Sequence, residues 1–222
     1  MTRQTVLVVA AHPDDEVLGC GGTMAAHVAR GDEVHVLILA QGLASRGPAE
    51  EAAFQALRAA AREAGEALGV TSLTLLDFPD NRLDGVELLD LVKVVEEQVA
   101  RHRPEVVYTH FAQDLNVDHR VTHNAVVTAC RPQPEHCVRT ILCFEVPSST
   151  EWSGHAFVAN WFVDIGPHLE KKKAALAAYA GEMRPFPHPR SIEGACHLAA
   201  WRGASAGVAA AEAFVLFRQR VI

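Results

Sequence analysis

Three carboxylates and one imidazole lie within a five-residue segment near the start of the chain. This segment, His12–Glu16 with the sequence HPDDE, directly follows the apolar run Val6–Ala11. His12 and Asp15 are three residues apart, so both can point at one metal ion, and Asp14 between them can lean towards the open side of that ion. Helix capping would account for one acid, but not for three acids and a histidine beside an apolar strand. We therefore expect a functional site here.

A second group of polar residues lies much later in the chain, in Asp114–His123. His119 and His123 are four residues apart and would share one face of a helix. They resemble half of the HExxH motif of zinc proteases, but Arg120 stands where that motif has its glutamate, which weakens this interpretation. The alternative is a polar helix start with two ordinary histidines. Asp118 is placed to orient a metal-bound imidazole.

Together the two segments supply the ligand set of a catalytic zinc ion. His12, Asp15 and one of the two later histidines would bind it through a nitrogen, an oxygen and a nitrogen, leaving a fourth position open for water. Zinc lowers the pKa of such a water to about 7, and Asp14 is the natural general base. The spacing alone does not choose between His119 and His123 as the third ligand.

Strand and helix patterns alternate along the first half of the chain, with short apolar runs typical of buried parallel strands. The predicted strands are residues 6–11, 33–40, 72–76, 105–108, 140–144, 161–165 and 212–217. The predicted helices are residues 17–30, 50–68, 87–102, 118–130, 169–180 and 192–201. The alternation favours right-handed βαβ units. It predicts a Rossmann-like three-layer α/β sandwich, with a mostly parallel sheet and helices on both faces, formed by one domain over residues 1–222.

Ligands of such sheets bind outside the carboxyl ends of the strands. The segments 12–16, 41–48 and 110–116 follow the first, second and fourth predicted strands, so they are expected to meet at this edge of the sheet. Both polar segments begin in these loops. The predicted fold therefore brings the two segments together although they are far apart in the sequence.

The composition excludes several other classes of protein. Hydrophobic residues make up 49% and charged residues 21% of the chain, which is typical of a globular protein. A net charge of −7, with Lys171–Lys173 as a short basic run expected to lie on a solvated helix face, argues against nucleic-acid and membrane-surface binding. No membrane span or signal peptide is apparent, so we expect a cytoplasmic protein. The five cysteines form no CxxC pair and are expected to be free thiols.

The motifs quoted above resemble those of the LmbE-like, or PIG-L, de-N-acetylases, zinc enzymes that act on N-acetylglucosamine-type substrates. The resemblance covers nearly the whole chain. The residues that carry it are AHPDDE, the GCGG stretch Gly19–Gly22, the DxNxDH run, Pro189–Ser191 and Ala211–Phe214. AHPDDE at a strand end, followed much later by an Asp-His pair, is a highly specific combination.

The resemblance implies one zinc ion per chain, with His12, Asp15 and His119 as its ligands and Asp14 as the general base. One position departs from the family pattern. Well-known members have a histidine three residues before the third ligand, whereas this chain has Asn116. An amide donates a hydrogen bond but does not shuttle a proton at neutral pH. Either Asn116 serves only as a donor to the oxyanion, or another group such as His110 supplies the acid.

The candidate substrate contacts are Arg46, Asp80, Asn81, Glu145 and Arg190. Arg46 lies in the loop after the second predicted strand, at this edge of the sheet. Asp80 and Asn81 either line the pocket or build a turn. The resemblance implies that the partner is a small amino sugar or glycoconjugate, and analogy with relatives suggests a homo-oligomer.

Two other functions fit parts of the pattern. The first is a metal-dependent amidase for another amide, such as a thiol-sugar conjugate or an acylated antibiotic or nucleoside intermediate. The second is a nucleotide- or metal-binding α/β module without catalysis, suggested by Gly19–Gly22. A dinucleotide fingerprint opens directly after the first strand, whereas these glycines fall inside the following helix. We therefore expect them to allow close helix packing.

Overall fold

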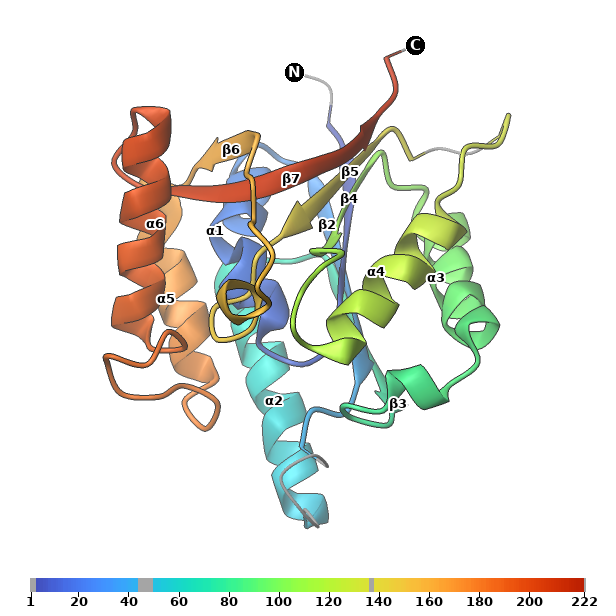
Figure 1. The fold of residues 1–222 in the computed structure, drawn as a ribbon, viewed down its shortest axis with the longest axis horizontal. Coiled ribbons are helices and arrows are strands. Elements are labelled where there is room, and N and C mark those ends of the chain that lie inside the picture. The colour runs from blue at the N-terminus through green and yellow to red at the C-terminus, as the bar shows by residue number, and fades with distance from the viewer. Residues whose placement is uncertain (1–2, 44–49, 136–137, 222) are drawn as a thin grey trace.

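The apolar runs of the chain form one seven-stranded sheet in the computed structural model, which describes residues 3–43, 50–135 and 138–221. The strands are β1 (Thr5–Ala10), β2 (Glu33–Ala40), β3 (Ser72–Phe78), β4 (Val106–His110), β5 (Thr140–Phe144), β6 (Trp161–Asp164) and β7 (Ala211–Gln219). Their order is β3-β2-β1-β4-β5-β7-β6 (Figure 1). The first five strands are paired in parallel, whereas β7 runs antiparallel to both β5 and β6. The expected mostly parallel sheet is confirmed.

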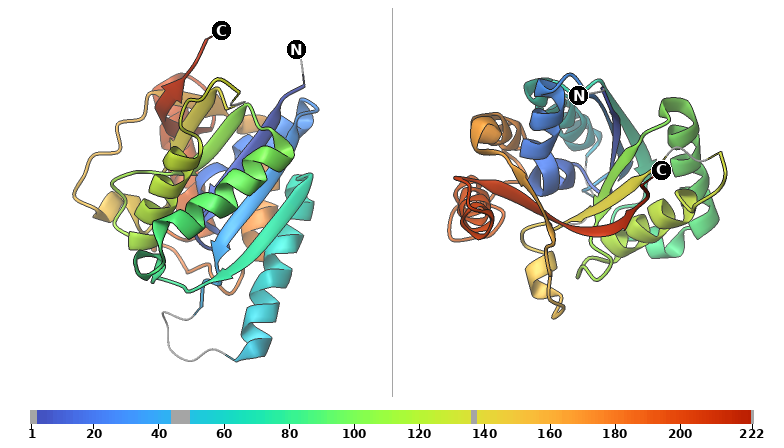
Figure 2. Two further views of the ribbon diagram at one scale, coloured as in Figure 1. Left: turned by 90° about the vertical axis from the view of Figure 1, so that its right-hand side faces the viewer. Right: turned by 90° about the horizontal axis from the view of Figure 1, so that it is seen from above.

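Helices cover both faces of this sheet, as predicted. They are α1 (Asp15–Ala29), α2 (Glu51–Leu68), α3 (Leu88–His102), α4 (Val117–Ala129), α5 (Leu169–Ala178) and α6 (Ile192–Ala206). Short 3-10 turns are η2 (Leu83–Gly85), η3 (Thr150–Trp152) and η4 (Gly166–His168). Figure 2 shows α3 and α4 on one face and α1, α2 and α5 on the other. Among the described residues, no helix has the length and apolar character needed to cross a membrane.

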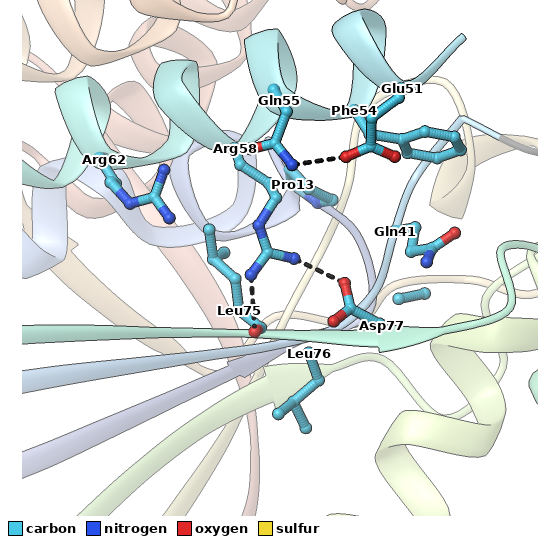
Figure 3. A pocket seen from close by; sticks show the side chains of 11 residues that line it. Pro13, Gln41, Glu51, Phe54, Gln55, Arg58, Arg62, Leu75, Leu76 and Asp77 are labelled. Carbon is cyan, nitrogen blue, oxygen red and sulfur yellow. Dashed lines mark hydrogen bonds and ion pairs between the residues drawn. The ribbon is translucent and has the colours of Figure 1, made fainter. Parts of the chain in front are cut away.

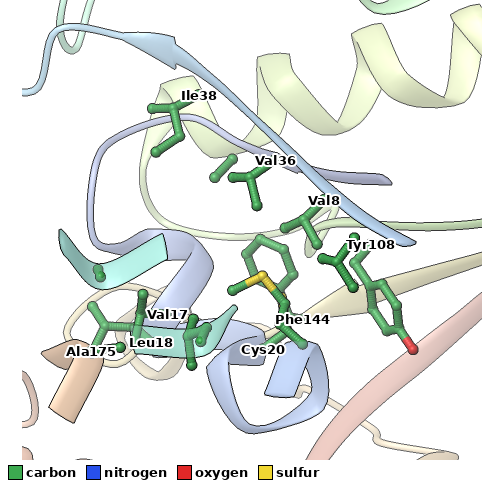
Figure 4. Close-up of a cluster of buried hydrophobic side chains, with 14 of the residues drawn as sticks. Val8, Val17, Leu18, Cys20, Val36, Ile38, Tyr108, Phe144 and Ala175 are labelled. Carbon is green, nitrogen blue, oxygen red and sulfur yellow. The ribbon is translucent and has the colours of Figure 1, made fainter. Parts of the chain in front are cut away.

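Residues of β1 alternate between two hydrophobic clusters, one on each face of the sheet. Val6, Val8 and Ala10 pack in the cluster that includes side chains of α1 and α2, part of which Figure 4 shows. Leu7 and Val9 pack with side chains of α3 and α4. Burial on both faces explains why this strand reads as an unbroken apolar run. The chain winds outward in opposite directions from the neighbours β1 and β4, so the crevice between their carboxyl ends is the topological switch point.

The GCGG segment lies at a break in α1. Cys20 has φ −147° and ψ 24°, which are not helical values. A Cβ atom on Gly19 would collide with the ring of Phe144, and one on Gly22 would lie 2.7 Å from Cδ1 of Ile165. These glycines allow the helix to approach β5 and the residue after β6 closely. The expectation of close packing is confirmed.

Substitution of Gly19 by alanine is expected to lower the free energy of unfolding by about 1–3 kcal/mol, because the Phe144 ring must move within a packed core. Urea denaturation measures this change. Gly181→Ala is the matched control, since a Cβ there meets no atom within 4 Å, and it should stay within about 0.5 kcal/mol of the parent. Equal stability of the two variants would contradict the close approach.

A buried ion pair bridges the break in α1. Lys172 Nζ on α5 lies 2.6 Å from Glu212 Oε1 and donates to the carbonyl of Leu18 at 2.9 Å. The Glu212 carboxylate accepts the backbone N–H groups of Gly22 and Thr23 at 2.9 and 2.7 Å. The expectation of a solvated basic face is therefore wrong for Lys172. Its side chain is buried because the broken helix leaves a carbonyl and N–H groups that need charged partners.

Candidate metal centre and active site

The carboxyl ends of β1 and β4 bring three candidate metal ligands together. His12 follows β1, Asp15 opens α1, and His119 lies in the first turn of α4. Asp15 Oδ2 is 3.2 Å from both His12 Nδ1 and His119 Nε2. All three side chains are buried, and their ligand atoms lie within 4.8 Å of one another. The other candidate, His123, instead faces away and contacts the carbonyl of His110 through Nδ1 at 2.9 Å.

Carboxylates hold the outer nitrogens of both ligand imidazoles. Asp118 Oδ2 lies 3.0 Å from His12 Nε2, and Asp114 Oδ1 lies 3.0 Å from His119 Nδ1. Such contacts fix the ring orientation and tautomer of metal-binding histidines. Asp118 thus contacts an imidazole, as expected, but that of His12 and not its neighbour in sequence. The backbone N–H of Asn81 also bonds to this carboxylate, at 2.7 Å.

The role of Asp114 was missed from the sequence. Its carboxylate accepts hydrogen bonds from the hydroxyls of Ser149 and Thr150, which follow β5, and from the backbone N–H of Asn116 at 2.9 Å. Hydrogen bonds to a carboxylate favour its charged form. Burial opposes ionisation of Asp114, but the hydrogen bond from His119 and these further donors lower its pKa to about 2. Asp114 begins the DxNxDH run, but only the fold joins it to the two hydroxyls.

The residues present fit a divalent metal ion. Asp15 Oδ1 is buried and has no hydrogen-bond partner among the described residues, and the buried His119 Nε2 has none there besides its 3.2 Å contact with Asp15 Oδ2. Leaving such atoms unpaired is costly, and an ion between them would satisfy both. Two imidazoles and one carboxylate suit zinc, and sites of this type also accept iron or cobalt.

The charges of these side chains also fit a bound cation. Burial lowers the pKa of His12, but hydrogen bonds to Asp118 and Asp15 outweigh it and raise this pKa to about 10. Burial likewise opposes protonation of His119, but Asp15 and Asp114 raise its pKa to about 9. The carboxylates thus favour positive charge between them. A metal ion supplies that charge, and its binding displaces the protons.

Asp14 lies beside these ligands with its side chain buried. Its backbone has φ 104°, in the left-handed region that few residues other than glycine adopt. Arg190 Nη1 is 3.4 Å from Asp14 Oδ2, so Arg190 joins the site from the loop before α6. Burial raises the pKa of Asp14 well above its usual range, although Arg190 opposes this shift. A carboxylate with a raised pKa is a stronger base.

Asn116 and His110, the two candidates for the proton donor, differ in their surroundings. The Asn116 side chain accepts from the backbone N–H of Asp118 at 2.8 Å and donates to Asn81 Oδ1 at 2.9 Å. It therefore caps α4 and keeps one amide hydrogen free for another acceptor. His110 is buried, and its Nε2 accepts the backbone N–H of Ala11 at 2.8 Å. Burial lowers its pKa well below the usual range, so His110 is neutral and supports the β1 end.

Two predicted substrate contacts lie near the first ligand. Asp80 Oδ1 is 3.3 Å from His12 Nε2, and the Asn81 side-chain amide donates to this oxygen at 3.0 Å. Both follow β3, and Asn81 has a positive φ of 52°. The backbone N–H groups of Asn81 and Leu83 donate to Asp118. Asp80 and Asn81 therefore belong to the same cluster as the candidate ligands.

Glu145, a further predicted contact, is paired elsewhere. Glu145 forms a bidentate pair with Arg202 of α6, at 2.8 and 2.7 Å. This carboxylate is therefore committed to holding α6 against the loop after β5. Arg46 lies outside the described residues, so its role stays a prediction from the sequence.

A cavity of about 620 Å³ lies against Pro13, between α2 and the ends of β2 and β3 (Figure 3). Four of its polar side chains form two pairs: Arg58 Nη1 is 2.6 Å from Asp77 Oδ1, and Gln55 Nε2 is 2.6 Å from Glu51 Oε1. None of the three candidate ligands lines it. This cavity adjoins the metal loop but holds none of the candidate reacting groups.

We expect Asp114→Asn to weaken zinc binding by about 10- to 100-fold, because the imidazole of His119 loses the negative charge that orients it and raises its basicity. Competition with a chromophoric chelator measures this affinity. Asp84→Asn, at an exposed position, is the control and should bind zinc like the parent. Equal affinities in both variants would contradict an orienting role for Asp114.

The fold and the site define an α/β protein with a His-Asp-His metal-binding arrangement at the switch point of its sheet. Residues 7–130, more than half of the chain, match the family PIG-L, described as GlcNAc-PI de-N-acetylase. The chain therefore belongs to the PIG-L family of deacetylases, and the resemblance noted from its motifs is confirmed.

Curated relatives carry deacetylase names and one hydratase name. "Uncharacterized deacetylase YaiS" of Escherichia coli (strain K12) is 28% identical over 152 residues, 66% of this chain and 76% of that protein. "Probable N-acetyl-alpha-D-glucosaminyl L-malate deacetylase 2" of Bacillus anthracis is 25% identical over 193 residues, 80% of each chain. "4-oxalmesaconate hydratase" of Pseudomonas putida KT2440 is 31% identical over 202 residues, 81% of this chain and 74% of that protein.

Solved structures share the whole fold. A conserved protein from Thermus thermophilus matches with TM-score 0.79 and 25% identity, over 99% of this chain and 97% of that chain. The 4-carboxy-2-hydroxymuconate hydratase of Pseudomonas putida KT2440 matches with TM-score 0.80 and 26% identity, over 99% and 98%. The N,N'-diacetylchitobiose deacetylase of Pyrococcus horikoshii shares the fold at 22% identity, with TM-score 0.73 over 97% and 84%.

Proposed function

We propose that this protein is a zinc-dependent de-N-acetylase that hydrolyses the N-acetyl group of a small amino-sugar substrate. The convergence of His12, Asp15 and His119 beside the buried carboxylate of Asp14 is the observation that carries this proposal. A bound zinc ion supplies Lewis acidity for activating water and polarising the amide carbonyl. The family description and the relative that is named for an N-acetylglucosaminyl substrate support the acetylated sugar.

In the proposed reaction Asp14 accepts the proton of the attacking water. Its carboxylate lies beside the ligands, and burial raises its pKa, which makes the carboxylate a stronger base. Arg190, at 3.4 Å, keeps the carboxylate in place and stabilises its charge before the transfer. Asp14 then gives the proton to the nitrogen of the departing amine, because the described neighbours hold no better placed acid.

Stabilisation of the oxyanion is assigned to donors at the mouth of the site. Asn116 keeps one amide hydrogen that its contact with Asn81 does not use. Preorganised donors of this kind stabilise a developing oxyanion more than the neutral carbonyl. His110 is assigned a supporting role, since its Nε2 already accepts from the backbone of Ala11. Arg46, Asp80 and Asn81 remain the proposed sugar contacts, and oligomeric state and cytoplasmic location remain expectations from the sequence.

Acetate release tests the proposal. The protein is incubated with a panel of N-acetylated amino sugars and with non-sugar acetamides, before and after chelation and after zinc is returned. We expect sugar deacetylation that chelation abolishes and zinc restores. Preference for a non-sugar or longer-acyl amide would favour the alternative amidase. Hydrolysis that is indifferent to metal removal would refute the metal-dependent mechanism.

A second candidate is a hydratase, which the 31% identity to the 4-oxalmesaconate hydratase favours. The family description, which names a de-N-acetylase, favours deacetylation over this candidate. Loss of the ultraviolet absorbance of an unsaturated oxo acid, without acetate release from any sugar, would favour the hydratase.

A further inference from the structure

We propose that Glu16 and Tyr179 form a positioning pair that holds the backbone of Asp14 in the conformation needed by the base. The proposal rests on the proposed function of Asp14, but its structural part does not depend on the identity of the substrate. Glu16 is the last residue of the AHPDDE run and is neither a candidate ligand nor the base. Tyr179 comes from the end of α5, beyond the segment 7–130 that matches the family.

The Glu16 carboxylate joins these two distant parts of the chain. Its Oε2 accepts the backbone N–H of Asp14 at 3.1 Å, and its Oε1 accepts the hydroxyl of Tyr179 at 2.6 Å. All three side chains are buried. A buried carboxylate needs such donors, so the Tyr179 hydroxyl fixes the rotamer of Glu16, and Glu16 fixes the peptide N–H of Asp14.

The backbone conformation of Asp14 explains why its hydrogen bond to Glu16 is needed. A non-glycine residue at φ 104° is strained and persists only where its surroundings enforce it. The strained turn directs the Asp14 carboxylate towards Arg190 and the candidate ligands. Without the bond to Glu16, the peptide would be free to relax and the carboxylate would move.

The turn after Tyr179 also leads towards Arg190. The backbone carbonyl of Tyr179 accepts the N–H of Glu182 at 2.8 Å, and Glu182 Oε2 lies 4.0 Å from Arg190 Nη1. Arg190 in turn approaches Asp14. The C-terminal part of the chain thus holds the base from two sides, through Glu16 at its backbone and through Arg190 at its carboxylate.

Tyr179→Phe tests the pair, because it removes only the hydroxyl. We expect kcat to fall by about 10- to 100-fold, with KM and zinc content unchanged, since a small displacement of a catalytic group has effects of this size. We also expect the Asp14 amide to exchange with solvent deuterium about tenfold faster in NMR measurements, because its hydrogen bond is weakened. The exchange measurement needs no substrate.

Tyr108→Phe is the matched control. Tyr108 is also buried, and its hydroxyl bonds to His27 Nε2 at 2.9 Å, in contact with the end of α1 and not with the Asp14 turn. This variant should lose a comparable hydrogen bond while keeping kcat and the exchange rate of the Asp14 amide. If Tyr179→Phe behaves like this control in both measurements, or loses kcat without faster exchange, the positioning role is overturned. A wild-type protein inactive on every amide would refute the proposed function, while the exchange data would still decide the role of the pair.

Two substitutions of Glu16 separate positioning from charge. Glu16→Gln retains an oxygen for the Asp14 N–H and an amide that can donate to the oxygen of Tyr179, so kcat should stay within about threefold of the parent. Glu16→Ala should lose activity and speed exchange as Tyr179→Phe does. Inactivity of Glu16→Gln with unchanged exchange would overturn the proposal, because a charged or proton-transferring role would then be required.

Discussion

Asp14→Asn is expected to lower kcat by about 10²- to 10⁴-fold while zinc content stays unchanged, because the amide cannot accept the proton of the attacking water. Asparagine keeps the shape of the side chain, and it tolerates positive φ better than most residues, so the turn at φ 104° should persist. Acetate release under saturating substrate and metal analysis of the purified variant measure the two effects.

The control for this variant is Asp84→Asn, which changes an exposed carboxylate. It should retain the parental kcat. Full activity of Asp14→Asn would remove Asp14 from the mechanism. Loss of zinc together with activity would instead mean that Asp14 helps to bind the metal, which its contact with Arg190 does not suggest.

The second large effect is expected for the third metal ligand. His119→Gln should bind zinc far more weakly than Asp114→Asn does, and acetate release should fall to background without added metal. Glutamine removes the buried Nε2 that has no other hydrogen-bond partner in the described chain and lies 3.2 Å from Asp15 Oδ2. Three protein ligands are the usual minimum for a catalytic zinc site, so loss of one leaves two.

His123→Gln is the matched control, one helical turn further along α4. Its Nδ1 contacts the carbonyl of His110 rather than Asp15, so this variant should keep about one zinc ion per chain. Titration with a chromophoric chelator compares the two variants directly. If His123→Gln loses zinc and His119→Gln retains it, the assignment of the third ligand is wrong.

Much of the fold could be predicted from the sequence, because its signals are local. The unbroken apolar run at 6–11 indicated a central strand, and β1 is buried on both faces. The first helix begins two residues earlier than predicted, because the Asp14 carbonyl accepts the first helical N–H bonds from Val17 and Leu18. Such end effects depend on turn geometry that side-chain periodicity does not encode.

The candidate site was predictable only in part. The ligand types and the base follow from HPDDE and the Asp-His pair, since a strand end and a helix start fix their spacing. The choice between His119 and His123 did not follow from spacing. Four residues advance a helix by about 6 Å, so only the first of these histidines reaches Asp15.

Residue types and their local order therefore determined the class of this protein: an α/β sheet with a histidine-carboxylate site at the ends of its strands. Tertiary structure alone decided the partners of each charged group. Asp114 meets Ser149, Glu145 meets Arg202, and Glu16 meets Tyr179 across 35, 57 and 163 positions of the sequence. No local pattern specifies such pairs, because hydrogen bonds form between whichever donors and acceptors the packing of the layers brings within reach.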